Sequence, residues 1–404
     1  MVIEAFEAGY VMKLKIIKVE GQNESLPIVV DESGLPIDKL NFFIIEELRG
    51  LADTTVEGRA RILIHIELWA KANCISLEEE MANSCLSKAG YLNSLISHLR
   101  NKSKIEQSNV VQLKPEQVTI DYFNLRLRLC EIYFEYLNNR FLSRVRLNDP
   151  KVSQNKIFYD KLIKKLKSKT ITGKSNSTKK GLSLLQQESL TKGLKDNRFF
   201  KWNSSTWLRN KLIIVLLYET GIRKGEMLSL TISNCITKVE KPYIIIKQNI
   251  TLKDPRVRVP QVKTEERIIP ISNLLAELIE EYKKVRSSQI EAKKQPPFLF
   301  LSSHLPYPPL AKSSVNGIFE AIKSSIPDIK KLSTHVLRHT RFENLERYFN
   351  EKKYDYAVRT KIKNSLGGWS RNSRTSENYE KLATEEQAYD VLKGMHTEID
   401  GGLY

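Results

Sequence analysis

A histidine and an arginine lie one helical turn apart in the sequence STHVLRHT, near the C-terminal end of the chain. The segment reads as a helix that Ser333 or Thr334 can cap. His335, Arg338 and His339 then share one face at i, i+3 and i+4 spacing, while the two apolar residues between them face inward. Positive donors that point to one spot are what a bound phosphate requires.

An isolated tyrosine, Tyr379, follows about forty residues further along the chain. The whole chain of 404 residues has a formal net charge of +18, from 65 Lys+Arg against 47 Asp+Glu. A basic excess of this size suits a polyanion held through many phosphate contacts. A tyrosine, a histidine and an arginine in such a chain predict chemistry on DNA, namely cutting and rejoining its strands.

A second arginine is expected in a turn, within TGIRKGEMLSL. An apolar helix should end at Gly221 and a new one should start near Lys224, which leaves Arg223 between them. A guanidinium fixed in this way is preorganised for a bidentate grip on phosphate oxygens, and Glu226 can orient it through a charge-assisted pair. An arginine and a glutamate paired across a turn are more often structural when they occur alone. Because the other motifs accompany it, we interpret the pair of Arg223 and Glu226 as functional.

The stretch PQVKTEERIIP predicts a tight turn between two strands, with Lys263 near its tip. An amine on a long stem can reach into a site and protonate a leaving oxygen, so Lys263 is a candidate general acid. For this residue by itself, a solvated hairpin lysine is the simpler interpretation. Arg267 is expected to hold the hairpin or to contact DNA.

The spacing of His335 and His339 matches H-x-x-x-H, a pattern that can also bind a metal ion. Arg338 lies on the same predicted helix face, where its charge would oppose a cation. No glutamate follows His335, as it does in H-E-x-x-H zinc sites. The sequence therefore predicts neither a metal nor any other cofactor.

Composition and periodicity divide the chain into four parts. Residues 1–40 carry short strands, and residues 41–150 show the apolar spacing of a compact helical bundle. Residues 151–180 contain ten lysines and one acid, which predicts a flexible basic linker or a solubilising disordered loop. Residues 181–404 form a larger domain. The expected fold class is mainly α with a small antiparallel β-sheet (α+β).

Other sequence features concern the compartment. Four scattered cysteines with no C-x-x-C pair suggest neither a zinc site nor a disulfide framework. No apolar run approaches the roughly 18 residues of a membrane span, and the first residues carry Glu4 and Glu7 where a signal peptide would be positive. We expect a soluble cytoplasmic protein, associated with the nucleoid and not with a membrane.

Taken in order, these motifs closely resemble those of the tyrosine recombinases, the phage-integrase family. The resemblance covers about residue 181 to the C-terminus, and the motifs are far more specific together than singly. Those that carry it are TGIRKGEMLSL around Arg223, Lys263-Thr264, HVLRHT from His335, LGGWS with Trp369, and TSENY ending at Tyr379.

The resemblance implies a two-domain, C-shaped clamp, with a helical core-binding (SAM-like) domain before the catalytic domain. Tyr379 would attack a scissile phosphate and form a 3′-phosphotyrosine, without water, metal or nucleotide. The implied roles of the other residues are charge stabilisation by Arg223, Arg338 and His339 or Trp369, general acid catalysis by Lys263, and assistance to proton transfer by His335.

The resemblance also implies partners. They are double-stranded DNA and further copies of the chain, which would act as a tetramer on two DNA sites, with a possible accessory directionality factor. The expected role is integration, excision or transposition of a mobile element. Residues after Tyr379 would either pass to a neighbouring subunit or pack within their own.

Two departures from the family pattern affect the nucleophile. Ten positions separate Trp369 from Tyr379, about one more than usual, and Lys381 stands where a histidine is usual. Trp369 itself can donate one N–H but cannot exchange a proton, so its expected role is to position the phosphate. The alternative nucleophiles are Tyr389, Tyr354 and Tyr356.

Two other functions fit the same residues. A type IB topoisomerase-like enzyme would relax supercoils without exchanging strands and would need no paired sites. A DNA-binding regulator descended from a recombinase would keep the charge and the fold without the chemistry, although the presence of all the motifs argues against it.

Overall fold

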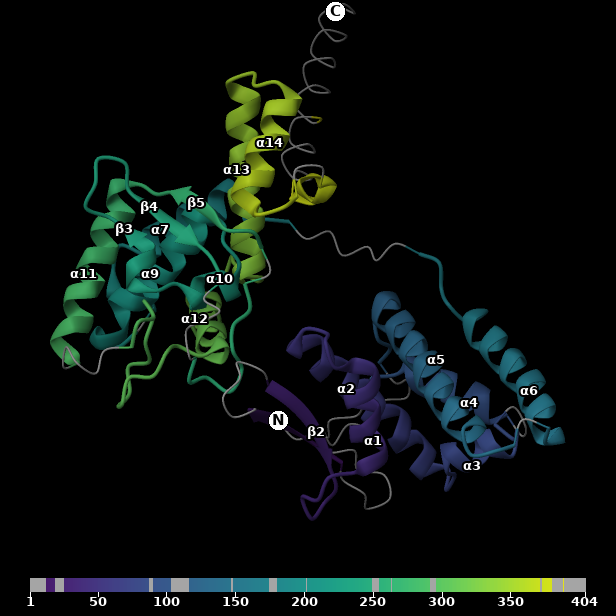
Figure 1. Cartoon of the computed structure of the whole chain (residues 1–404). Coiled ribbons are helices and arrows are strands. Elements are labelled where there is room, and N and C mark those ends of the chain that lie inside the picture. Colours follow the sequence, from purple (N-terminus) through teal and green to yellow (C-terminus); the bar gives the residue numbers. More distant parts are fainter. Residues whose placement is uncertain are drawn as a thin grey trace, which may run out of the picture. The chain divides into compact units, whose positions relative to one another are not determined.

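A computed structural model describes residues 12–18, 25–86, 90–102, 116–146, 148–173, 180–200, 202–248, 254–262, 264–290, 296–370, 373–379 and 388. The chain divides into two compact units, Met1–Ser177 and Thr178–Tyr404 (Figure 1). Within the described ranges, no helix combines the length and the hydropathy that a lipid bilayer requires of a spanning segment.

The first unit is helical, with a two-stranded antiparallel sheet near its N-terminal end. The predicted early strands are present, and they pack on the helices, with Met12 and Val29 buried in the core that the helices form. The elements are β1 (Lys13–Lys18), β2 (Ser25–Val30), α1 (Asp38–Phe43), η1 (Ile44–Leu48), α2 (Asp53–Ala72), α3 (Leu77–Ala82), α4 (Tyr91–Arg100), α5 (Ile120–Leu142) and α6 (Pro150–Lys167).

The structure corrects the linker expected at residues 151–180. Most of that stretch is α6, which begins after the cap Asp149 and carries Pro150 in its first turn. Phe158, Leu162 and Leu166 are buried in the core of the first unit, at the i, i+4, i+8 spacing of one helix face. The lysines lie between these positions, so a basic composition conceals an amphipathic helix.

The second unit is mostly helical and contains a three-stranded antiparallel sheet in the order β3-β4-β5 (Figure 1). This agrees with the expected fold class. The elements are α7 (Leu184–Gly193), α8 (Asn197–Phe200), α9 (Ser204–Thr220), α10 (Lys224–Ser229), η2 (Ile232–Asn234), β3 (Cys235–Ile236), β4 (Tyr243–Ile246), β5 (Arg267–Pro270), α11 (Asn273–Gln289), α12 (Lys312–Ser325), α13 (Thr334–Glu351), α14 (Tyr356–Gly367) and η4 (Arg374–Tyr379).

Helix α9 forms the centre of the second unit. Leu212, Ile213, Ile214, Leu216 and Leu217 all have 0% exposure, which places apolar side chains around most of its circumference. Helices α11 and α13 both contact it. The end of α9, where Arg223 follows, is therefore fixed by the core.

The sequence PQVKTEERIIP, which predicts two strands around a tight turn, has a strand on one side only. Only β5 is a strand, and residues 254–262 are irregular. Arg256 is buried there: it pairs with Asp254 at 2.5 Å and donates to the carbonyl oxygens of Leu228 and Leu310 at 3.1 and 3.0 Å. The Arg256 side chain thus anchors this irregular segment to residues 228 and 310.

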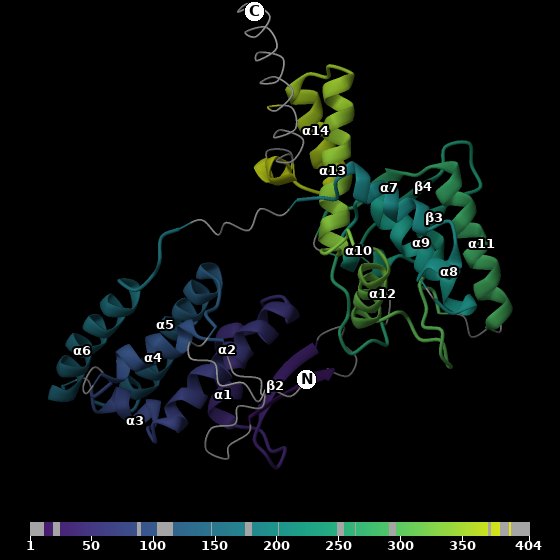
Figure 2. The ribbon, with the colours of Figure 1, turned by 180° about the vertical axis from the view of Figure 1, so that it is seen from behind.

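Helices α13 and α14 lie side by side in both views (Figures 1 and 2). The carboxylate of Glu346 on α13 accepts hydrogen bonds from Lys363 Nζ and Arg359 Nη1 of α14, both at 2.9 Å. Lys363 has 0% exposure. Because a buried ion is costly without its partner, this cluster fixes the two helices in one register.

Replacement of Lys363 by Met should test this cluster. It leaves Glu346 buried with less positive charge beside it, so we expect the free energy of unfolding to fall by about 3 kcal/mol. Urea unfolding measures the loss. Lys361→Met, on an exposed position of the same helix, is the control and should change the value by no more than about 0.5 kcal/mol. Equal effects would show that the buried cluster does not hold the helices.

Candidate active site

Two arginines from distant parts of the chain converge on one carbonyl oxygen. Arg223 Nη1 and Arg338 Nη2 each donate to the oxygen of Gly367, both at 3.0 Å. The two guanidinium groups therefore lie side by side and can serve a single phosphate group. The Arg223 side chain is 32% exposed and Arg338 only 1%, so Arg223 forms the solvent edge of the pair.

The turn that holds Arg223 is built as its sequence predicts. Helix α9 ends at Thr220, and Gly221 has φ +65°, the left-handed conformation that glycine adopts at helix ends. Arg223 is the N-terminal cap of α10, and its backbone N–H donates to Glu226 at 2.8 Å. Arg338 Nη1 donates to the carbonyl oxygen of Gly221 at 2.7 Å, which ties the turn to α13.

A glycine cap ends α14 directly beside this pair. Gly368 has φ +62°, and its N–H donates to the carbonyl oxygen of Ser365 at 3.3 Å. The next N–H, that of Trp369, donates to the carbonyl oxygen of Asn364 at 3.0 Å. This is the Schellman arrangement, which satisfies two carbonyl groups of the last turn and leaves the final two to find other donors.

Three arginines supply those donors. Arg267 Nε donates to the carbonyl oxygen of Leu366 at 3.0 Å, and the pair described above donates to that of Gly367. The C-terminal end of a helix carries roughly half a negative charge, so cations are stabilised there. The end of α14 therefore gathers Arg223, Arg267 and Arg338 into one cluster.

The carboxylate of Glu226 neutralises part of the positive charge of this cluster. Its carboxylate accepts from Arg267 Nη2 at 2.9 Å, from the Thr264 hydroxyl at 2.7 Å and from Arg223 Nη1 at 3.3 Å. Burial raises the pKa of Glu226, but the hydrogen bond and charge of Arg267, with the Arg223 N–H and the Thr264 hydroxyl, outweigh burial and hold that pKa below its ordinary value. The carboxylate is thus ionised at neutral pH.

Among the described residues, the cluster contains three guanidinium groups and one carboxylate. Positive charge in excess, close together and largely buried, favours a bound anion. The arrangement therefore suits a phosphate group that bears developing negative charge.

The other residues of the HVLRHT motif differ in burial. The helix is capped as predicted, since Ser333 Oγ accepts from the N–H of Val336 at 3.3 Å. His335, in the first turn of α13, is exposed, whereas His339 is 5% exposed. The predicted common face of His335, Arg338 and His339 is thus split between solvent and core.

Trp369 lies against Arg338. Its ring centroid is 4.8 Å from the guanidinium carbon of Arg338 and 5.0 Å from the ring of Phe342. An indole face attracts a guanidinium and orients it. The structure thus brings Trp369 together with the arginine pair, as the motif order predicts.

Tyr379 is the last residue of η4, which contacts both α13 and α14. Tyr356 begins α14 and is separated from the arginine cluster at the other end of that helix by about 16 Å, at 1.5 Å per residue. Tyr354 precedes the same remote end. Tyr389 lies outside the described residues. Among the candidate nucleophiles that the structure describes, Tyr379 alone is on an element that contacts both α13 and α14.

Lys263 also lies outside the described residues, so its predicted position on the hairpin stays a prediction. Its neighbour Thr264 is described and is a site residue that the sequence did not single out. Its hydroxyl accepts from Arg267 Nη1 at 2.9 Å while it donates to Glu226. The presence of Thr264 beside Lys263 in the family motif was the signal that could have identified this threonine.

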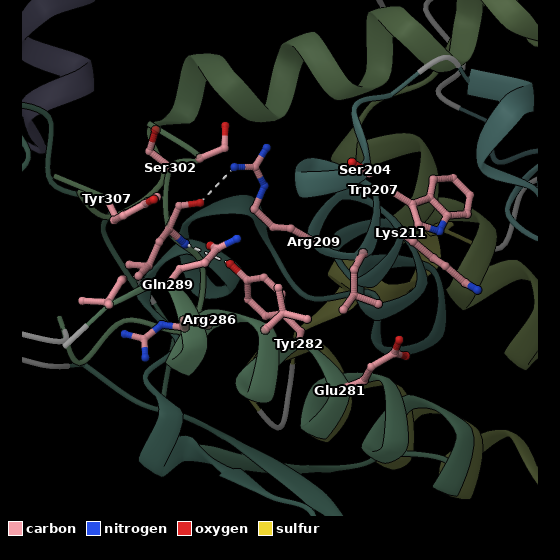
Figure 3. Close-up of a pocket in the computed structure, with 15 residues that line it drawn as sticks. Ser204, Trp207, Arg209, Lys211, Glu281, Tyr282, Arg286, Gln289, Ser302 and Tyr307 are labelled. Carbon is pink, nitrogen blue, oxygen red and sulfur yellow. Dashed lines mark hydrogen bonds between the residues drawn. The ribbon is translucent and has the colours of Figure 1, made fainter. Parts of the chain in front are cut away.

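A separate cavity of about 300 Å³ lies between α9, α11 and residues 301–307 (Figure 3). Neither the arginine cluster nor the other candidate catalytic residues described above line this cavity. Arg209, 8% exposed, donates from Nη1 to the carbonyl oxygen of Leu301 at 2.9 Å, and the Leu301 N–H donates to the Tyr282 hydroxyl at 3.3 Å. These bonds hold the chain after Phe300, so Arg209 is a structural anchor.

Gly225 offers a test of how closely α10 packs on the segment before Lys263. A Cβ at this position would lie 2.4 Å from the carbonyl oxygen of Gln261. We expect Gly225→Ala to lower the free energy of unfolding by about 1–3 kcal/mol, measured by urea unfolding. The control is Gly317→Ala on α12, where an added Cβ would have no atom within 4 Å. Its free energy of unfolding should rise by about 0.5–1 kcal/mol, because alanine favours a helix more than glycine does. A tolerated Gly225→Ala would contradict the close approach.

Glu226→Gln should change the pH dependence of stability. Because the folded-state pKa of Glu226 is lowered, its ionised carboxylate stabilises the fold above the ordinary value of 4.5, and this contribution is lost as the pH falls below it. The difference in unfolding free energy between wild type and Glu226→Gln should therefore shrink as the pH falls below 4.5. Urea titrations at several pH values measure it. A difference that is constant with pH would refute the ionised network.

Known proteins share both the sequence and the fold. The chain is 29% identical over 133 residues to tyrosine recombinase XerD of Halalkalibacterium halodurans, which covers 33% of this chain and 39% of that protein. It is 28% identical over 197 residues to XerD of Vibrio cholerae, covering 47% and 53%. The matches thus span less than two thirds of either relative's length.

Solved structures resemble the fold over most of the chain. The Tn1549 transposon integrase with transposon right end DNA aligns with a TM-score of 0.50 and 15% identity, covering 87% of this chain and 98% of that one. A variant of it with circular intermediate DNA aligns with a TM-score of 0.53 and 16% identity, with the same coverage. The phage integrase family itself matches residues 185–386, half of the chain. With the motifs in their expected order on this fold, the chain belongs to the phage integrase family.

Proposed function

We propose that the chain is a site-specific DNA recombinase of the tyrosine type, which cleaves and rejoins DNA through a 3′-phosphotyrosine. The observation that carries this proposal is the convergence of Arg223 and Arg338 on one oxygen at the end of α14. A site that excludes most water makes such fixed positive charges effective in stabilising a transition state. The family membership of the chain supports the same reaction class.

In the proposed reaction, the Tyr379 oxygen attacks the scissile phosphorus in line with the leaving 5′-oxygen. A bond from tyrosine to phosphorus forms as the bond to the 5′-oxygen breaks, so the products are a 3′-phosphotyrosine and a free 5′-hydroxyl. A 5′-hydroxyl from the partner strand then reverses the step. Each phosphodiester bond broken is replaced by another, so rejoining needs no ATP.

Charge and protons are assigned to separate residues. Arg223 and Arg338 stabilise the nonbridging oxygens, with Trp369 or His339 assisting in positioning the phosphate. Lys263 protonates the leaving 5′-oxygen, and His335, exposed at the start of α13, assists removal of the tyrosine proton. Glu226, Thr264 and Arg267 support the arginines.

The substrate is double-stranded DNA, and two sites are brought together by a tetramer of the chain, with a possible accessory factor that sets the direction. Support comes from the net charge of +18 and from the solved relatives, which are complexes of a transposon integrase with DNA. They also favour a role in integration, excision or transposition of a mobile element.

A suicide substrate tests the nucleophile. DNA with the recombination junction of the chain's own element, nicked near the cleavage position, should trap wild type as a covalent protein–DNA band on a denaturing gel. Tyr379→Phe should bind the DNA and give no band, because a phenyl ring has no attacking oxygen. Tyr356→Phe, which alters an exposed tyrosine at the far end of α14, is the control and should keep the band.

Arg223→Ala should give the band at least about a hundredfold more slowly, because one donor to the developing charge is lost. Binding by wild type without a band would favour the DNA-binding regulator. A band, followed by relaxation of supercoiled DNA that carries a single site and no strand exchange between two sites, would favour the topoisomerase-like reaction. A band that persists in Tyr379→Phe and disappears in Tyr356→Phe would reverse the assignment of the nucleophile.

A further inference from the structure

Arg267 connects three segments that are far apart in the sequence. Its Nε donates to the carbonyl oxygen of Leu366, its Nη1 to the Thr264 hydroxyl and its Nη2 to Glu226, at 3.0, 2.9 and 2.9 Å. These acceptors belong to the end of α14, to the segment that follows Lys263 and to α10. We propose that Arg267 is a positioning residue, which sets the catalytic arginines by fixing the last peptide of α14.

The path from Arg267 to the arginines runs through one residue, Gly367. The carbonyl of Leu366, which Arg267 holds, and the N–H of Gly367 belong to the same planar peptide. The carbonyl of Gly367 then accepts from Arg223 and Arg338. Loss of the bond to Leu366 allows this end of the helix to rotate, and both guanidinium groups follow the oxygen they bond.

A second path runs through the carboxylate of Glu226. Arg267 and Thr264 bond this carboxylate and each other, which closes a triangle of hydrogen bonds. The same carboxylate accepts from the backbone N–H and the side chain of Arg223. Arg267 therefore fixes Arg223 at two points, through the carbonyl of Gly367 and through Glu226.

The fit around Arg267 is close and directed inward. The side chain is 7% exposed, and each of its three guanidine nitrogens bonds a protein acceptor. A Cβ on Gly368 would lie 2.7 Å from Nη1, so the guanidinium packs directly on the glycine cap. Of the two roles expected from the sequence, holding the structure is favoured over contact with DNA.

The geometry also calls for arginine in particular. A planar fork can serve three acceptors on three segments at once, whereas a lysine ammonium is a compact charge on a flexible stem. Arg267→Lys keeps the positive charge beside buried Glu226 and so limits the risk of misfolding. It removes the fixed geometry, which is the property under test.

The experiment rests on the proposed function, so the wild-type covalent adduct is measured first. Single-turnover cleavage and DNA affinity are then compared for wild type, Arg267→Lys and Arg267→Gln. We expect cleavage to slow by up to about a hundredfold with unchanged affinity, because a displacement of about 1 Å at a reacting centre has that effect. Arg209→Gln, which removes another buried arginine anchor in the same unit, should cleave at the wild-type rate.

Two further measurements separate positioning from a general structural defect. If Arg267 acts through Arg223 and Arg338, the double variant Arg267→Lys/Arg223→Ala should lose less activity than the product of the two single losses, because part of the effect of Arg267 disappears with Arg223. A substrate with sulfur in place of the bridging 5′-oxygen has a leaving group that needs little protonation. It should not restore cleavage by Arg267→Lys, since the proposed defect lies in the arginines and not in Lys263.

Each outcome decides one claim. No adduct with wild type overturns the proposed function itself. An adduct with wild type and an unchanged rate for Arg267→Lys overturns the positioning role alone. Additive losses in the double variant, or rescue by the sulfur substrate, would also overturn it, because Arg267 would then act apart from Arg223 or through Lys263.

Discussion

The carbonyl end of α14 is the interaction on which the rest of the site depends. Three guanidinium groups repel one another, and they can share a largely buried place only if negative partners hold them there. The partial negative charge of the helix end and the carboxylate of Glu226 supply those partners. Because the helix end carries only about half a negative charge and Glu226 one, three guanidinium groups leave the cluster with a net positive charge.

The core of the second unit positions the segments that meet at this point. Buried α9 ends in the turn of Arg223, and α13 both carries Arg338 and contacts α9. The Glu346 cluster then holds α14 on α13, so the helix end that accepts from the arginines is fixed relative to Arg338. Packing far from the site thus determines distances within it.

Local signals in the sequence predicted the parts that depend on local structure. The break at Gly221 and the cap at Ser333 are set by residue type within a few positions, and both are present. Helix α6 was missed because its lysines concealed three buried apolar residues at helical spacing. The role of the Gly367 oxygen could not be predicted, since every residue has a carbonyl group and only the tertiary approach of three segments selects this one.

Helix α14 packs on α13 through Lys363 and also presents its final carbonyl groups to the arginines. This double role limits how sequences of the family can vary here. One residue inserted within this helix would turn its final carbonyl groups by about 100° and advance them by about 1.5 Å, away from the arginines that bond them. The same change would displace η4, which ends at Tyr379. Relatives that keep this arrangement should therefore conserve the length from Lys363 to Gly368 strictly, while the Tyr356 end of the helix remains open to insertions.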